Sequence, residues 1–166
     1  LTRRPDLVLG GINHGDNSAV NAHYSGTMGV CYEGAMAGFP AVAFSLDNHS
    51  SEADFTPLRP YLVDITLKVL KEGLPAFSCL NVNFPNASEF KGIKVGRMGI
   101  SRWVKETHKC FHPTTNQPYL WLVGYRENLE PEATDTDIWA LENGYVAVTP
   151  VTLDVTDYKL LESLSF

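Results

Sequence analysis

Short apolar runs alternate with longer amphipathic stretches along the first half of the chain. The runs at residues 6–9, 41–46 and 77–82 have the length of buried strands, and each begins one or two residues after a proline. Residues 57–72 instead place apolar side chains three to four positions apart, which predicts a helix. The small residues of 25–37 suit a second helix packed tightly on a sheet. Strands and helices that alternate in this way predict an α/β fold with a mostly parallel sheet.

The helical spacing disappears after Gly92. The following segments have the composition of strands: 93–97, 101–111 and 119–125. The turn residues 113–116 join the last two of these segments, so we expect a long antiparallel hairpin.

The end of the chain returns to mixed structure. An alternating pattern at 144–149 predicts a strand, and residues 154–164 predict a short amphipathic helix. We therefore expect residues 1–91 to belong to the α/β core. Residues 92–166 are expected to add a hairpin arm, a final strand and a terminal helix within the same domain.

Composition narrows the class of protein. A chain of 166 residues, 44% hydrophobic and 19% charged, can form one globular domain with a substantial core. Its net charge of −6 argues against nonspecific binding to nucleic acid polymers or anionic membranes. The three cysteines form no C-x-x-C pair and leave one unpaired, which favours a reducing compartment, so we expect the cytoplasm. Because the first residue is Leu1 and not Met, we expect a fragment.

The segment after the first predicted strand carries the densest group of polar side chains. Asn13 follows the strand directly, at the position where open α/β sheets place ligands. Its amide oxygen is a hard, neutral ligand that suits Mg²⁺ or Mn²⁺, ions that usually also require carboxylates. Asn and Asp are equally common in loops because they form Asx turns. Spacing alone therefore leaves both a ligand site and a simple turn open.

Ser25, Gly26 and Thr27 begin the helix that follows this segment. Two hydroxyls and the free N–H groups of a first helical turn can hold a phosphate, although an ordinary N-cap explains the same residues. Together with Asn17, eight residues earlier, they predict one anion site. The sequence has no nucleophile elbow, P-loop, H-E-x-x-H helix or dinucleotide fingerprint.

A second candidate lies in the predicted hairpin. His108, Cys110 and His112 alternate and so share one face of a strand, which raises the possibility of a zinc site. Ligands spread along an extended strand converge on one ion only if the strand bends. The sequence therefore favours a solvated hairpin.

The sequence of residues 6–45 resembles the central motif of the SurE family. These are the stationary-phase survival proteins, metal-dependent phosphatases of nucleoside 5′/3′-monophosphates. The similarity rests on residues 6–17, 24–27, 33–34, 38–41, 45–46, 80–85, 91–95, 135–137 and 144–150. It covers essentially the whole chain, with one small departure, because the serine common before Gly-Ile-Asn is a glycine here, Gly10 or Gly11.

The resemblance implies both a fold and a site. It implies a three-layer Rossmann-like core, with an extended hairpin and terminal helix used in subunit exchange, and hence a homodimer or homotetramer. It also implies that Asn13 binds a divalent cation, Mg²⁺ or Mn²⁺, one per subunit. The residues that the resemblance places around the phosphate of a nucleotide substrate are Asn17, Ser25, Gly26 and Thr27.

The resemblance also points to missing residues. Family members open with a strand that ends in two adjacent aspartates and carry a later serine, and none of these lies in this sequence. We therefore expect the catalytic aspartates before Leu1 and an inactive isolated fragment. The complete protein is expected to be an acid-phosphatase-like nucleotidase. Two alternatives stay open: a noncatalytic phosphometabolite-binding or assembly module, and a phosphatase for polyphosphate or another phosphomonoester.

Overall fold

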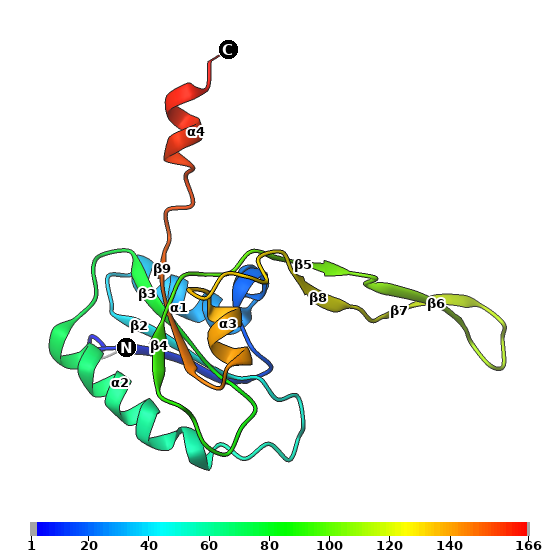
Figure 1. The fold of residues 1–166 in the computed structure, drawn as a ribbon, viewed down its shortest axis with the longest axis horizontal. Coiled ribbons are helices and arrows are strands. Elements are labelled where there is room, and N and C mark those ends of the chain that lie inside the picture. The colour runs from blue at the N-terminus through cyan, green and yellow to red at the C-terminus, as the bar shows by residue number, and fades with distance from the viewer. Residues whose placement is uncertain (1–2, 166) are drawn as a thin grey trace.

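A five-stranded sheet forms the centre of the computed structural model, which describes residues 3–165 (Figure 1). Its strands, in spatial order, are β1 (Val8–His14), β2 (Ala41–Leu46), β3 (Ser78–Phe84), β9 (Val146–Thr152) and β4 (Ile93–Val95). Strands β1, β2 and β3 are parallel, whereas β9 runs antiparallel to β3 and parallel to β4. The expected α/β class with a mostly parallel sheet is confirmed.

Helices cover both faces of this sheet, which gives the three layers. On one face α1 (Gly26–Met36) packs against small side chains of β2 and β3. The opposite face packs against α2 (Arg59–Glu72), which follows the short 3₁₀ turn η2 (Thr56–Leu58). Side chains alternate along β2, so Phe44 faces α2 while Ala43 faces α1.

The small residues of α1 serve close packing, as the sequence suggests. A Cβ atom at Gly34 would lie 2.9 Å from the side chain of Val8 on β1. Buried Met28, Cys31 and Ala35 form the rest of the contact face. The helix therefore packs directly on β1, and this contact holds the first turn of the helix near the end of that strand.

Strand β1 continues beyond the predicted end at Leu9, so that boundary is wrong. The strand passes through two glycines to His14, and its register with β2 shifts between Gly10 and Asn13. A Cβ at Gly10 would lie 2.7 Å from the carbonyl oxygen of Thr27. Gly11 has φ +107°, and a Cβ there would collide with the carbonyl oxygen of Phe44. The glycines allow the strand to pass close to α1 and β2, and they do not end it.

The arm is a pair of two-stranded ribbons that projects from the core (Figure 1). Its strands are β5 (Ser101–Val104), β6 (Thr107–Phe111), β7 (Pro118–Leu122) and β8 (Tyr125–Asn128). Strand β5 pairs with β8, and β6 pairs with β7, both antiparallel. The single strand predicted over 101–111 is broken at Lys105, which has φ 53°. The expected hairpin is present, but in two segments.

Two further helices complete the chain. Helix α3 (Asp137–Glu142), which the sequence pattern did not predict, packs Ala140 and Leu141 on Ala147 of β9. Helix α4 (Tyr158–Ser163) is shorter than predicted and extends away from the core at the end of β9 (Figure 1). Among residues 3–165, no helix combines the length and apolar character needed to cross a bilayer.

Candidate functional site

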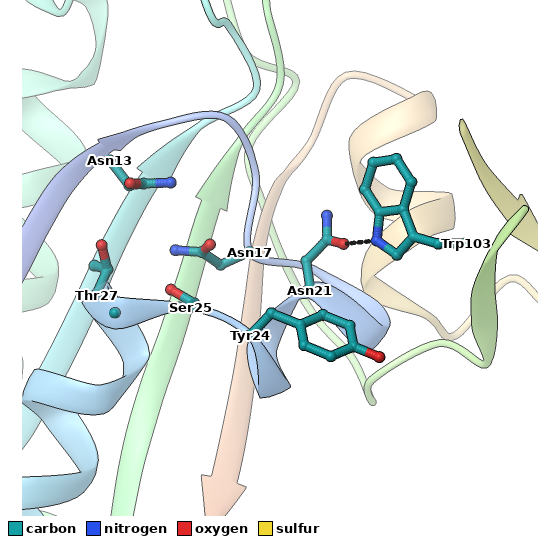
Figure 2. Close-up of a pocket in the computed structure, with 8 residues that line it drawn as sticks. Asn13, Asn17, Asn21, Tyr24, Ser25, Thr27 and Trp103 are labelled. Atoms are coloured by element: carbon teal, nitrogen blue, oxygen red, sulfur yellow. Dashed lines mark hydrogen bonds between the residues drawn. The ribbon is translucent and has the colours of Figure 1, made fainter. Parts of the chain in front are cut away.

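A pocket of about 580 Å³ opens where β1 ends and α1 begins (Figure 2). This volume falls in the usual range for small-ligand sites. The lining residues are Asn13, Asn17, Asn21, Tyr24, Ser25, Gly26, Thr27 and Trp103. The structure thus brings the five predicted site residues together in one cavity. The sequence pattern missed Asn21 and Trp103.

Asn13 is half-buried at the end of β1, paired in register with Ser45 of β2. Its amide nitrogen donates to the carbonyl oxygens of Gly15, at 2.9 Å, and His14, at 3.1 Å. These two bonds orient the amide and leave the Oδ1 atom as the group that the side chain can offer to a ligand. An oriented neutral oxygen suits one position in the coordination shell of a hard cation.

Asn17 is held by a buried polar network that reaches into two strands. Its backbone N–H donates to Asn83 Oδ1 at 2.7 Å, and its Nδ2 donates to Ser45 Oγ at 2.6 Å. Asn81 Nδ2 donates to the Asn17 carbonyl oxygen at 2.8 Å, and Asn83 Nδ2 donates to Asn81 Oδ1 at 2.8 Å. Buried polar groups are costly unless they are paired in this way. The network fixes Asn17 while leaving the second hydrogen of its amide for a ligand.

Two asparagines in an otherwise apolar strand are the sequence feature that could have indicated this network. Asn is depleted in strands, so Asn81 and Asn83 in the otherwise apolar β3 point to a specific role. Both side chains lie on the face that holds Asn17. Local periodicity identifies the strand but not the partner of its polar side chains.

The first turn of α1 forms the other wall. Ser25 is the N-cap, and its Oγ accepts from the backbone N–H of Met28 at 3.1 Å, so its hydroxyl hydrogen can still be donated. The first backbone N–H groups of a helix have no partner within the helix. A Cβ at Gly26 would meet no atom within 4 Å, so the space in front of this turn is open. In Figure 2, Ser25 and Thr27 lie on the same side of the cavity as Asn13.

An ion pair beside the pocket connects the arm to the loop that lines the site. Arg126 of β8 donates through Nη1 to Asp16 Oδ2 at 2.5 Å and to Ser18 Oγ at 2.8 Å. The two charged side chains are only 19% and 10% exposed. Asp47 lies nearby, where burial and then the charge of Asp16 raise the pKa of its carboxyl, opposed by Arg126 and His49. The positive charge of Arg126 at the base of the arm therefore partly offsets the negative charges of Asp16 and Asp47.

Asp137 anchors the 3₁₀ turn η1 (Ala19–His23), which leads from Asn17 toward α1. Its carboxylate accepts the backbone N–H groups of Ala19, Gly99 and Ile138, each at 2.8 Å. Burial raises the pKa of this carboxyl, and the three N–H donors oppose that shift. The start of α3 therefore holds the loop that lines the pocket.

The hairpin histidines do not form a metal centre. Within residues 3–165, no group of three or more His, Cys, Asp or Glu side chains is placed to hold a metal ion. His112 Nδ1 accepts the backbone N–H groups of Thr114 and Thr115, as in an ordinary turn. Asn13 therefore fits a cation only as one oxygen ligand among others.

Comparison with known proteins identifies relatives over nearly the whole chain. The family model described as Survival protein SurE matches residues 1–105. The chain is 51% identical over 164 residues to the 5′-nucleotidase SurE of Phocaeicola vulgatus and 50% identical over 165 residues to that of Bacteroides thetaiotaomicron. Each alignment covers 99% of this chain and 63% of the relative, so the chain spans less than two thirds of their length.

A solved structure shows the same fold. The crystal structure of the SurE protein from Aquifex aeolicus superposes with a TM-score of 0.79 at 41% sequence identity. The match covers 98% of this chain and 65% of that chain. The mixed sheet, its flanking helices and its Rossmann-like arrangement are therefore shared with that protein.

Proposed function

Since this chain belongs to the family of survival protein SurE, we propose that the natural protein is a metal-dependent nucleotidase. Its substrates are nucleoside 5′- and 3′-monophosphates, and the reaction releases inorganic phosphate. The observation that carries the proposal is the convergence of Asn13, Asn17 and the Ser25–Thr27 turn on one pocket. Relatives at about 50% identity bear the name 5′-nucleotidase SurE, which supports the same activity.

The phosphate lies against the first turn of α1 in this proposal. The hydroxyls of Ser25 and Thr27 and the free N–H groups at the helix start donate to the phosphoryl oxygens, and the helix dipole favours their negative charge. The remaining amide hydrogen of Asn17 adds a donor from the opposite wall. These fixed donors stabilise the charge that develops on the equatorial oxygens during transfer. The net negative charge of the chain is thereby offset locally.

The divalent cation, Mg²⁺ or Mn²⁺ with one per subunit, is assigned to Asn13. A bound cation of this kind polarises a phosphoryl oxygen and lowers the pKa of the attacking water. Asn13 presents Oδ1 toward the pocket because its amide nitrogen is held by Gly15 and His14. The aspartate pair and the other ligands are assigned to residues preceding Leu1. On this proposal the 166 residues alone bind phosphate but do not catalyse hydrolysis.

The arm and α4 are assigned to subunit exchange in a homodimer or homotetramer. Apolar side chains are exposed along β7 and α4 and at the C-cap of α4, namely Tyr119, Leu120, Trp121, Leu122, Leu160, Leu161 and Leu164. Exposed apolar patches on projecting elements are typical of protein contacts. The cysteines Cys31, Cys79 and Cys110 are all unpaired, which supports a cytoplasmic location.

Phosphate release from AMP by the full-length natural protein, with Mg²⁺ or Mn²⁺, tests the proposal. Asn13→Ala is expected to lower kcat by roughly a hundredfold or more, since a cation ligand is lost. Asn86→Ala, in an exposed loop where its side chain accepts a hydrogen bond from Asn48, is the matched control and should retain activity.

Each remaining outcome contradicts a specific part of the proposal. Full activity in Asn13→Ala means that the assignment of Asn13 to the cation is wrong. A wild-type protein that binds AMP without hydrolysing it is a binding module. Faster hydrolysis of polyphosphate than of AMP makes the protein a different phosphatase.

A further inference from the structure

The pocket has an aromatic end that the phosphate and cation assignments do not use. Trp103 of β5 lines it from the arm base, and Tyr24 lines it from the end of η1. In Figure 2 Trp103 lies on the far side of the cavity from Asn13, with Asn21 between them. Trp103 is 37% exposed and Tyr24 is 75% exposed, so ring surface remains available to a ligand.

The Trp103 ring is fixed by contacts with the site loop. Its Nε1 donates to Asn21 Oδ1 at 2.9 Å, and Asn21 Nδ2 donates to the Asp16 carbonyl oxygen at 3.3 Å. Ser101, two residues earlier on β5, accepts the backbone N–H of Val20 at 3.3 Å through its Oγ. The polar atom of the indole is therefore satisfied within the protein. What the ring still offers to the cavity is a flat apolar surface.

We infer that Trp103, together with Tyr24, is a stacking surface for the base of the nucleotide. The inference rests on the proposed function, because it takes the phosphate to lie at the α1 turn. A nucleoside monophosphate with its phosphate there must direct its base elsewhere in the same pocket, and the aromatic end is apolar and partly exposed. Bases stack on aromatic rings through their π faces.

The same contacts determine what kind of selectivity to expect. Every base has a π face, so stacking tolerates different bases and favours those that stack strongly. Asn21, the polar side chain beside the indole, already uses Oδ1 and Nδ2 within the protein. The stacking surface therefore recognises the presence of a base and discriminates weakly among bases. Purine nucleotides are favoured over pyrimidine nucleotides by ring size alone.

The test compares substrates with and without a base in the full-length natural protein. Steady-state kinetics are measured for AMP and for ribose 5-phosphate in wild type, Trp103→Leu and Trp103→Phe. Trp103→Leu is expected to raise KM for AMP roughly tenfold, with a much smaller change in KM for ribose 5-phosphate and little change in kcat. Trp103→Phe keeps a ring and should recover most of the affinity for AMP.

Phe77→Leu is the control for loss of an exposed aromatic ring. Phe77 precedes β3, at the opposite end of the strand from the site, and is 59% exposed. This variant should behave as wild type with both substrates. If Trp103→Leu raises KM equally for AMP and ribose 5-phosphate, Trp103 only supports the loop and the inference is overturned.

A binding measurement separates this inference from the proposed function. Adenosine, which lacks phosphate, should quench tryptophan fluorescence in wild type and not in Trp103→Phe. If wild type hydrolyses neither substrate, the proposed function fails, and the adenosine titration still decides the stacking surface. Equal quenching in both proteins, or none in wild type, overturns it.

Discussion

Apolar side chains are buried in the core and exposed on the arm. In the core, Phe84, Met28 and Leu58 are completely buried by the sheet and its helices. On the arm, Leu122 is 81% exposed, and its neighbours Leu120 and Trp121 are exposed as well. A two-stranded ribbon has no second layer of its own to cover a face. The chain therefore covers the apolar side chains of its own core and leaves those of the arm exposed.

The pocket belongs to both regions. The core supplies Asn13, Asn17 and the α1 turn, while the arm base supplies Trp103. Arg126 of the arm base also pairs with Asp16 in the loop that leads to the pocket. The base of the arm is thus integrated into the site, although its far end is exposed. The difference teaches that the arm has two parts: a base that completes the pocket and a tip free for contacts.

The largest expected difference between the regions is in stability. Phe84→Ala should lower the free energy of unfolding by about 3–5 kcal/mol, since it opens a cavity in the core. Leu122→Ala should change it by less than about 0.5 kcal/mol at low protein concentration, because the side chain is exposed in the single chain. Urea denaturation measures both. A large loss with Leu122→Ala under those conditions would show that the arm packs within its own chain.

The junction should show an intermediate effect. Arg126→Met removes the partner of a nearly buried carboxylate and should cost about 2–3 kcal/mol. Arg102→Met is the matched control, because its pair with Glu127 at 2.6 Å lies on the same ribbon but is largely exposed. Its expected cost is about 0–1 kcal/mol. Hydrogen exchange should locate the Arg126→Met effect at residues 16–23, and equal costs for the two variants would contradict the proposed anchoring.

Thiol reactivity should also differ between the core and the arm. Burial raises the pKa of Cys31 to about 11 and that of Cys79 to about 12, so reactive thiolate is scarce at neutral pH. Cys110 on β6 is only partly buried. Iodoacetamide should modify Cys110 roughly a hundredfold faster than the two core cysteines. Mass spectrometry identifies the modified residue, and similar rates for all three would mean that the core opens readily.

The smallest effect is expected on the outer surface of the core. Lys68 and Glu72 form an exposed pair at 2.8 Å on α2, one helical turn apart. Lys68→Ala should cost about 0.3–0.5 kcal/mol, because solvent and salt screen such pairs. Thermal melting at low and high salt measures it. A cost near that of Arg126→Met would remove the distinction between the junction and the surface.

The elements that the sequence predicted correctly are those specified by a few neighbouring residues. Strand β2 and helix α1 lie where expected, because an apolar run and a serine N-cap are read within a few residues. The boundary of β1 was missed because glycines usually interrupt strands, whereas here the close approach of Thr27 and Phe44 requires them. Helix α3 was missed because it has only six residues, too few to show a helical period.

The site likewise has one part formed by residues close together in sequence and another formed by distant residues. Asn13, Asn17 and the Ser25–Thr27 turn are close together in sequence, and the family resemblance added their expected roles. The family resemblance includes Asp137, but the contacts of Trp103 and Asp137 with the loop could not be predicted, because they span 82 and 118 residues of sequence. Spacing carries no information about contacts of this range, which depend on how the arm base and α3 dock onto the core.

The position of β9 has a consequence for synthesis of the protein. It is the last strand among residues 3–165, yet it lies between β3 and β4 in the sheet. At about 5–20 residues per second, a ribosome completes β9 roughly 3–14 s after β3. During that interval β3 presents an unpaired edge, the kind of surface on which nascent chains associate. A premature stop before Val146 would therefore remove the strand that connects β4 to the rest of the sheet and leave β4 without its neighbour.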